Sequence, residues 1–284
     1  MTAGTVYARG WTLDDIDWSK FDKSKVEPWL LAAVKAAALI EFNAPDYVSY
    51  LKRVFREGNG ATLSAIEQWG CEESQHGQAL GRWAELADPD FKMEEAFARF
   101  RRGYRPAHFN SKDETSVRGS RRGEMIARCV VESGTSSYYT AIRDCTQEPV
   151  LKEIAARIAS DEYRHYRLFY DTLNDQNESD LPFWRKLLIA AGRISESDDD
   201  ELSYAFYCVT IPPEREALEP YDRRKCARDS FATGMRIYRP QHIRKLVQMV
   251  AKVIGAHPHG LFARVASAIT WQMMRLRAGA SALV

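Results

Sequence analysis

Two short stretches of the sequence carry most of the information about the fold: C-E-E-S-Q-H-G at 71–77 and S-D-E-Y-R-H at 160–165. Each contains Glu-x-x-His, and on a helix residues three apart project from the same face. Glu73 can therefore present a carboxylate beside His76, and Glu162 can do so beside His165. One such pair is usually a surface ion pair. Two pairs, each on an otherwise apolar helical face, predict buried carboxylates that need a counter-charge or a metal.

Two further acidic residues stand where the helical pattern calls for a core residue. Glu41 follows the apolar stretch that opens at Pro28, and Glu132 lies on an apolar face of the stretch 119–144. Each half of the chain thus has a glutamate on one helix and Glu-x-x-His on the next. Two antiparallel helix pairs would bring four carboxylates and two imidazoles to one level of a four-helix bundle, as in ferritin-like di-iron or di-manganese proteins. The predicted ligands are Glu41, Glu73, His76, Glu132, Glu162 and His165.

The chemistry of this ligand set favours two iron ions, with manganese as an alternative. Carboxylate oxygens with only two imidazoles suit iron or manganese better than zinc or copper. The other four histidines, His108, His242, His257 and His259, lack acidic partners at helical spacing and are interpreted as ordinary residues.

Helical periodicity extends over most of the chain, and no convincing strand pair is present. Pro45 lacks the N–H that would bond to the carbonyl of Glu41, so a bend is expected beside that residue. The sequence predicts an all-α fold: one ferritin-like domain over 1–284, with a bundle core at 28–177 and a helical extension at 182–280 packed on it. The expected helices are 28–57, 62–86, 92–102, 119–144, 149–174, 182–193, 200–209, 222–236, 239–254 and 259–279.

Composition limits the cellular setting and the partners. The 284 residues include 40 Lys and Arg against 39 Asp and Glu, which gives no global reason to expect nucleic acid as a partner. No apolar run reaches the ~18 residues of a membrane span. Five cysteines without a C-x-x-C spacing argue against a disulfide framework and favour a reducing, cytoplasmic location. Charge is uneven, however, because residues 221–284 hold twelve Lys and Arg but two Asp and Glu.

Four motifs together resemble those of the soluble acyl-acyl-carrier-protein desaturases. Residues 69–77 form W-x-x-E-E-x-x-H-G, and residues 41–47 form E-x-x-x-P-x-Y. Residues 132–135 form E-x-x-T, and residues 161–165 form D-E-x-x-H. The resemblance covers about residues 35–175 and implies a ferritin-like di-iron protein that desaturates an acyl chain held as a thioester.

The resemblance also implies roles for individual residues. Glu41 and Glu132 would be terminal or bridging ligands, Glu73 and Glu162 bridging or chelating ligands, and each histidine would bind one iron. Thr135 matches a hydroxyl that assists proton delivery, although it can instead bond back to its own helix. Asp161 matches a carboxylate that orients the imidazole of His76 on the electron-entry route. None of Trp11, Trp18 and Trp29 can be singled out as an electron relay.

The implied partners are an acyl carrier protein or another acyl thioester, a ferredoxin-type electron donor, and a second copy in a homodimer. Carrier proteins are acidic, and the segment from Arg99 to Arg122 holds eight Lys and Arg against Asp113 and Glu114. This basic strip is one candidate docking surface. Its alternative is an ordinary solvated loop.

Other functions remain open. Leu80 stands where a ribonucleotide reductase radical subunit would carry tyrosine, and Ile158 stands where the di-iron N-oxygenases carry an extra histidine. Desaturation is the leading interpretation. The alternatives are a di-iron hydroxylase or N-oxygenase acting on another small molecule, and a ferroxidase or other iron-handling protein.

Overall fold

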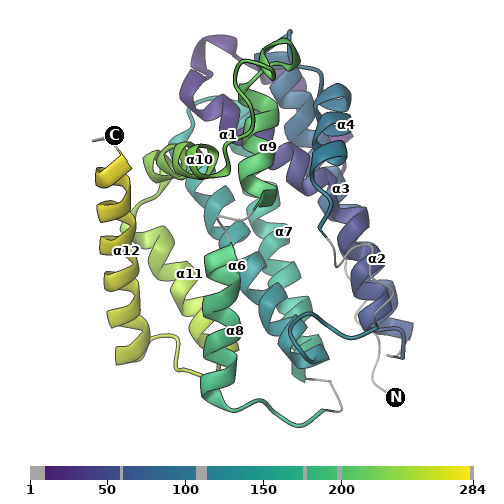
Figure 1. The fold of residues 1–284 in the computed structure, drawn as a ribbon, viewed down its shortest axis with the longest axis vertical. Helices are drawn as coiled ribbons and strands as arrows, with labels where there is room; N and C mark the ends of the chain where they lie inside the picture. Colours follow the sequence, from purple (N-terminus) through teal and green to yellow (C-terminus); the bar gives the residue numbers. More distant parts are fainter. Residues whose placement is uncertain (1–9, 58–59, 107–113, 175–177, 197–199, 282–284) are drawn as a thin grey trace.

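A computed structural model describes residues 10–57, 60–106, 114–174, 178–196 and 200–281. All regular structure in these ranges is helical (Figure 1), which confirms the predicted all-α class. His108, Lys112 and Asp113, three residues singled out in the sequence, lie outside the described ranges. Within those ranges, no helix has both the length and the hydrophobicity to cross a bilayer.

The helices agree closely with the predicted ranges, with one exception in the first. Short 3-10 turns at Leu13–Asp15, Trp18–Lys20 and Lys23–Lys25 precede the first helix, and another lies at Pro213–Arg215. The α-helices are α1 Pro28–Phe42, α2 Ala44–Val54, α3 Gly60–Ala87, α4 Met93–Gly103, α6 Arg121–Cys145, α7 Pro149–Asn174, α8 Phe183–Ser195, α9 Asp200–Thr210, α10 Arg223–Ile237, α11 Pro240–Val253 and α12 Leu261–Ser281.

The exception is the stretch 28–57, which is two helices rather than one bent helix. α1 ends at Phe42 and α2 begins at Ala44, with Asn43 between them. Pro45 has no N–H to bond to the carbonyl of Glu41, and the Asn43 amide bonds to the carbonyl of Ile40 in a tighter turn. The break follows Glu41 by two residues, so it fixes the end of the helix that carries this carboxylate.

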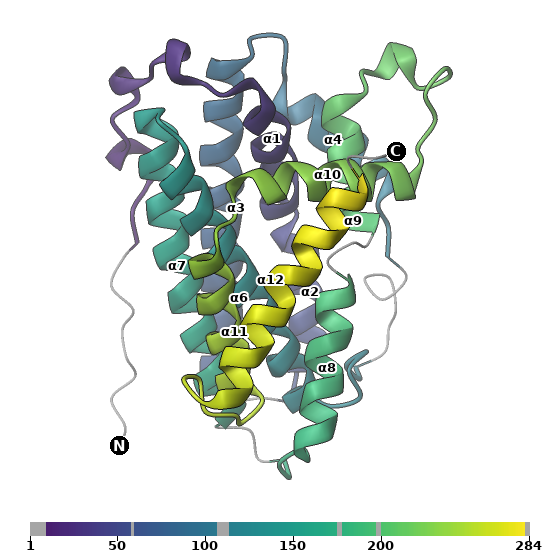
Figure 2. The same ribbon diagram turned by 90° about the vertical axis from the view of Figure 1, so that its left-hand side faces the viewer.

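Four long helices form the centre of the molecule. α1 packs on α3, α3 on α7, and α7 on α6, so the helices form two hairpin-like pairs (Figures 1 and 2). The later helices cover this group from outside: α9 contacts α1, α8 and α11 contact α6, and α12 lies on α10 and α11.

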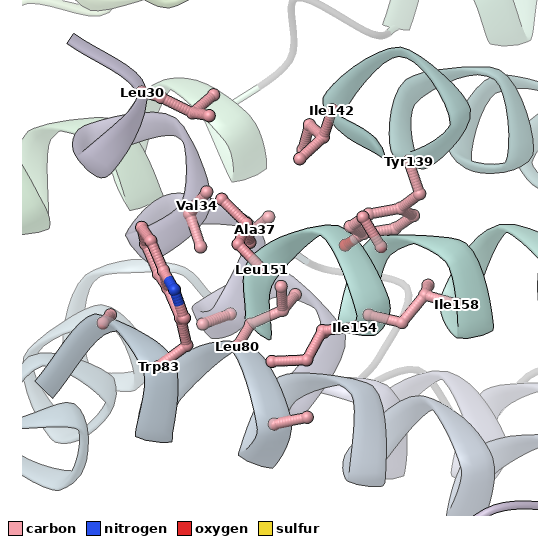
Figure 3. Close-up of a cluster of buried hydrophobic side chains, with 14 of the residues drawn as sticks. Leu30, Val34, Ala37, Leu80, Trp83, Tyr139, Ile142, Leu151, Ile154 and Ile158 are labelled. Atoms are coloured by element: carbon pink, nitrogen blue, oxygen red, sulfur yellow. The ribbon is translucent and has the colours of Figure 1, made fainter. Parts of the chain in front are cut away.

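Of the three apolar clusters among the described residues, two lie between the central helices, one toward each end, and the third joins α1, α4 and α9. One includes Leu80 and Trp83 of α3 and Ile154 of α7 (Figure 3). The other includes Trp69 of α3 and Phe169 of α7. Along α3 and α7 the stretch between the clusters contains both Glu-x-x-His motifs. The predicted ligands therefore lie in a dry layer between two apolar regions.

Gly77 permits α1 and α3 to approach each other closely beside this layer. A Cβ at this position would lie 2.6 Å from the backbone nitrogen of Phe42, which is tighter than any ordinary contact. The Gly77→Ala variant should therefore lose about 1–3 kcal/mol in free energy of unfolding, because one helix must shift. Chemical denaturation of the metal-free protein measures the loss.

Gly192→Ala is the matched control for this prediction, since a Cβ there meets nothing within 4 Å. It should gain about 0.5–1 kcal/mol from helix propensity. Equal losses in the two variants would contradict the close approach at Gly77.

Candidate metal centre

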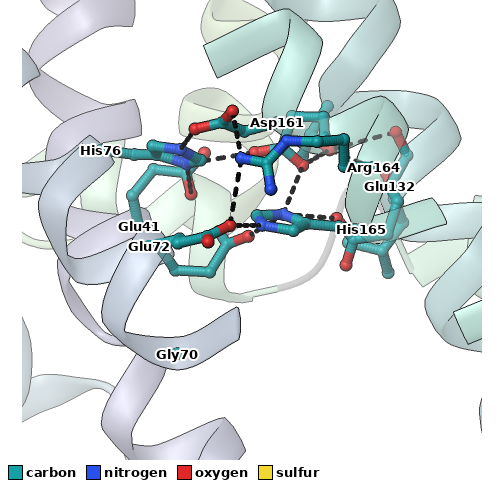
Figure 4. Close-up of polar contacts among 12 residues, drawn as sticks. Glu41, Gly70, Glu72, His76, Glu132, Asp161, Arg164 and His165 are labelled. Atoms are coloured by element: carbon teal, nitrogen blue, oxygen red, sulfur yellow. Dashed lines mark hydrogen bonds and ion pairs between the residues drawn. The ribbon is translucent and has the colours of Figure 1, made fainter. Parts of the chain in front are cut away.

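The structure brings all six predicted ligands together in the layer between the apolar clusters. Glu41 comes from the last turn of α1, and Glu132 from the middle of α6. α3 supplies one Glu-x-x-His motif and α7 supplies the other (Figure 4). All six side chains are buried. Residues up to 124 positions apart in the sequence thus meet at one level of the four central helices.

The ligand atoms form two overlapping groups, each able to hold one metal ion. Glu41, Glu73, His76 and Glu162 make the first group, with one ligand atom from each lying within 4.8 Å of all the others. Glu132 and His165 replace Glu41 and His76 in the second. Glu73 and Glu162 belong to both groups, which is the position that bridging carboxylates occupy between two ions.

The atoms that face the centre lack hydrogen-bond partners. Nδ1 of His165 lies 2.9 Å from Oε1 of Glu73, and Nδ1 of His76 lies 3.3 Å from Oε1 of Glu162. These four atoms are nevertheless buried without any hydrogen bond, as is Oε1 of Glu132. Buried polar atoms are almost always hydrogen-bonded. Oxygen and nitrogen donors that converge without bonding to one another fit a metal-binding site.

The pKa values of these side chains are shifted because several carboxylates are buried close together. Burial and the neighbouring carboxylates raise the pKa of Glu41 and Glu132 well above the usual value. Burial alone would lower the pKa of His76, but its carboxylate neighbours, led by Asp161 and Glu162, raise it to about 9. Burial also opposes ionisation of Glu73, yet its contacts with Glu41 and His165 lower its pKa to about 2. Without metal, the cluster must hold extra protons to limit its negative charge.

Each imidazole is held from behind by an acidic residue of the opposite motif. Nε2 of His76 lies 3.0 Å from Oδ2 of Asp161, the residue before Glu162. Nε2 of His165 lies 2.8 Å from Oε2 of Glu72, the residue before Glu73. Each Glu-x-x-His motif is therefore preceded by the carboxylate that orients the imidazole of the other motif. A carboxylate on Nε2 fixes the tautomer that leaves Nδ1 free to bind a metal.

Arg164 and Trp11 complete the outer side of the centre. The Arg164 guanidinium bonds to Asp161 at 2.5 Å and to Glu72 at 3.4 Å, so it links the two outer carboxylates (Figure 4). The indole N–H of Trp11 donates to Asp161 at 2.7 Å, and its ring is stacked with the His76 ring at 6.0 Å. Of the three N-terminal tryptophans, the structure thus singles out Trp11 as the one joined to the site.

Two hydroxyl groups bond to ligand carboxylates. Thr135 Oγ1 donates to Glu162 Oε2 at 2.5 Å and also lies 3.3 Å from two carbonyls of its own helix. Thr135 thus contacts a ligand carboxylate and also lies close to carbonyls of its own helix, and its role in proton delivery stays a prediction. Tyr139 donates to Glu41 Oε1 at 2.5 Å. Hydroxyl groups of α6 thus fix one oxygen of Glu162, which belongs to both ligand groups, and one oxygen of Glu41, which belongs to the first.

Glu72, Arg164 and Tyr139 were not assigned roles from the sequence. Glu72 could have been found, because it precedes Glu73 just as Asp161 precedes Glu162. The i,i+3 spacing from Asp161 to Arg164 is also visible, but ion pairs of this kind are common on helix surfaces. The pairing of Tyr139 with Glu41 joins two helices and has no local signal.

Because Glu72 and Asp161 hold the two imidazoles in the same way, their replacement should have similar effects. Glu72→Gln and Asp161→Asn should each weaken metal binding by about 10- to 100-fold, because the imidazole loses its fixed tautomer and part of its basicity. Competition with a chromophoric chelator measures this. Glu67→Gln, an exposed residue of α3 paired with Lys52, is the control and should leave affinity unchanged. Unchanged affinity in both outer variants would contradict the assigned orientation.

The basic strip from Arg99 to Arg122 is largely paired within this chain. Arg99 is buried and bonds to Glu216 at 2.5 Å, and Arg101 bonds to Asp46 at 2.7 Å. Further ion pairs join Arg118 to Glu196, Arg121 to Glu57 and Arg122 to Asp180. Much of the positive charge is therefore neutralised by the chain's own carboxylates.

The chain was also compared with known proteins. No family model matches the sequence, and no curated protein matches it.

Proposed function

We propose that this chain is an oxygen-dependent di-iron oxidoreductase that desaturates an acyl chain presented as a thioester. One observation supports the metal centre above all: donor atoms of four buried glutamates and two buried histidines converge, and three of the glutamates and both histidines each have a buried donor atom with no hydrogen bond. The acyl substrate is supported by the resemblance of the four motifs to the acyl-carrier-protein desaturases. The ions are proposed as iron, with manganese as the alternative for this donor set.

The proposed ligand roles follow from the two overlapping groups. Glu41 and His76 would serve one ion, and Glu132 and His165 the other, with Glu73 and Glu162 bridging. The chemistry that two bound iron ions would supply is reductive activation of dioxygen, which removes hydrogen from an unactivated methylene. Apolar clusters on both sides of the site would keep water away from it.

The chain's other residues would prepare this reaction. Asp161 and Glu72 would orient the imidazoles, and Thr135, bonded to Glu162, would pass a proton to the centre. Trp11, Asp161 and His76 form a hydrogen-bonded series from a half-buried indole to the site, and we propose it as the route for electrons. The external donor would be a ferredoxin-type protein, since the sequence has no flavin or iron–sulfur motif.

The proposed architecture is a ferritin-like bundle formed by residues 28–177, with 182–280 as an extension of the same domain. The pairing of α1 with α3 and of α6 with α7 supports this proposal. A homodimer and an acyl carrier protein remain proposed partners.

The test combines iron-loaded protein, reduced ferredoxin, oxygen and acyl-carrier-protein substrates of several chain lengths, with lipid products analysed by mass spectrometry. A product with a new double bond is the expected result. Oxygen incorporated into an organic product would instead identify a hydroxylase or N-oxygenase. Iron oxidation with no organic product from any substrate would identify a ferroxidase and contradict the desaturase proposal.

A further inference from the structure

Exposed apolar side chains are concentrated on two helices far from the metal centre in sequence. Of the fifteen large hydrophobic residues that are exposed in the described part of the chain, eleven belong to α8 or α12. Exposed large apolar residues that gather on neighbouring elements of a soluble protein usually mark an interaction site. We name these exposed residues of the two helices the α8–α12 surface.

The residues of α12 lie along one face of the helix. Phe262, Val265, Ile269, Met273 and Leu276 follow one another at intervals of three or four residues. Such spacing places side chains on a single stripe. Met273 is 64% exposed and Leu276 is 74% exposed, so the stripe points away from the protein. The opposite side of α12 packs on α10 and α11.

α8 continues the apolar surface beside α12. Phe183 and Phe262, near the first residues of the two helices, are in edge-to-face contact with centroids 6.3 Å apart. Both helices lie on the same outer side of the molecule (Figure 2). Trp184, which is 61% exposed, and Leu188 extend the surface from this contact.

The charge of the two helices is of one sign. α8 contains Arg185, Lys186 and Arg193, α12 contains three arginines, and neither helix contains Asp or Glu. Asp180 and Glu196, which flank α8, pair with Lys186 and Arg193. Of the α12 arginines, Arg264 and Arg275 have no ion pair with a carboxylate in the described part of the chain. The wider segment 221–284 is also strongly basic, with twelve Lys and Arg against two Asp and Glu.

We propose that the α8–α12 surface binds the face of an anionic lipid bilayer, with its apolar side chains inserted at the level of the headgroups. Apolar and aromatic residues on one face together with Lys and Arg at its borders are the composition of interfacial helices. Anionic headgroups complement the net positive charge of the two helices, including the arginines Arg264 and Arg275. The helices would lie on the membrane rather than span it.

Two other occupants fit the surface less well. A second copy in a symmetric dimer would set these cations against the same cations of its partner, because the same patch meets itself across a two-fold axis. An acidic carrier protein would satisfy the charges but would leave the exposed aromatic and aliphatic side chains without an apolar partner. An anionic bilayer offers negative headgroups to the cations and an apolar layer to the exposed side chains.

The experiment is cosedimentation of the full-length, iron-loaded protein with vesicles. Vesicles of phosphatidylcholine mixed with phosphatidylglycerol should bind the protein about tenfold more strongly than phosphatidylcholine alone, and added salt should release it. The double variant M273E/L276E should lose about tenfold or more in vesicle affinity, since it places charge in the stripe. Leu218→Glu is the matched control: Leu218 is 81% exposed, lies outside the surface, and should keep wild-type binding.

The remaining outcomes contradict the proposal. Absence of vesicle binding by the wild-type protein would overturn it, as would equal losses in M273E/L276E and L218E. Sedimentation equilibrium detects a dimer, and titration with an acidic acyl carrier protein detects carrier binding. If M273E/L276E instead dissociates a dimer or abolishes carrier binding while vesicles do not bind, the surface is a protein interface. Circular dichroism of each variant confirms that the helices are intact.

Discussion

Replacing Glu162 by alanine is expected to abolish tight binding of both metal ions, whereas Glu41→Ala and Glu132→Ala should each impair one. The reason is geometric: Glu162 offers an oxygen to both ligand groups, and each of the other two residues belongs to one group. At a metal concentration about a thousand times its dissociation constant, binding stabilises the folded protein by about 4 kcal/mol per site. The Glu162→Ala variant should lose most of this stabilisation. Elemental analysis after desalting and thermal unfolding with and without Mn²⁺ measure both effects.

The stability of the metal-free protein distinguishes the loss of a metal ligand from damage to the fold. In the metal-free protein Glu162 contacts His76 and Thr135 but adds to the charge of three other buried carboxylates, so Glu162→Ala should change the stability of this state less than that of the metal-loaded state. The difference between the two losses is the contribution of the metal. Glu67→Ala, which alters an exposed glutamate of α3, should change neither quantity. Retention of both ions by Glu162→Ala would refute the bridging position.

The sequence was informative wherever spacing along one helix determines the outcome. Glu73 with His76, and Glu162 with His165, are three residues apart, so one helical turn places each pair on a common face. Apolar residues at the same periodicity predicted the central helices to within a few residues at most ends. The convergence of the two motifs could be anticipated because the same ligand pattern occurs twice in matching halves.

Contacts between distant segments were not predictable from spacing. Trp11 and Asp161 are 150 positions apart, and nothing local indicates that the N-terminal segment lies over the centre. The internal ion pairs of the basic strip were not predictable for a related reason, because a run of arginines does not reveal the carboxylates elsewhere in the chain that pair with it. Pro45 indicated a disturbed helix, but the complete break at Asn43 depends on how the backbone satisfies its hydrogen bonds. On α12, the periodicity identifies a shared face but not whether protein or solvent covers it.

Metal loading should release protons, and the affinity for metal should fall steeply as the pH decreases. The pKa of His76 is raised to about 9, and those of His165, Glu41 and Glu132 are raised well above their ordinary values. A group with a raised pKa keeps its proton below that pKa, and metal binding must displace it. Filling both sites near neutral pH should therefore release up to about four protons.

Calorimetric titration of the metal-free protein with Mn²⁺, in buffers that differ in ionisation enthalpy, counts these protons. Glu41→Gln and Glu132→Gln should each release about one proton fewer, because an amide has none to lose. The same variants should also show a weaker dependence of affinity on pH. Binding that is independent of pH up to about 9 would mean that the imidazoles and carboxylates are already deprotonated in the metal-free protein. In that case the fold would contain four buried carboxylates with no compensating positive charge. The apolar clusters on both sides make such an arrangement strongly unfavourable. The number of protons released is thus a direct measure of how the protein balances the charge of this centre before metal arrives.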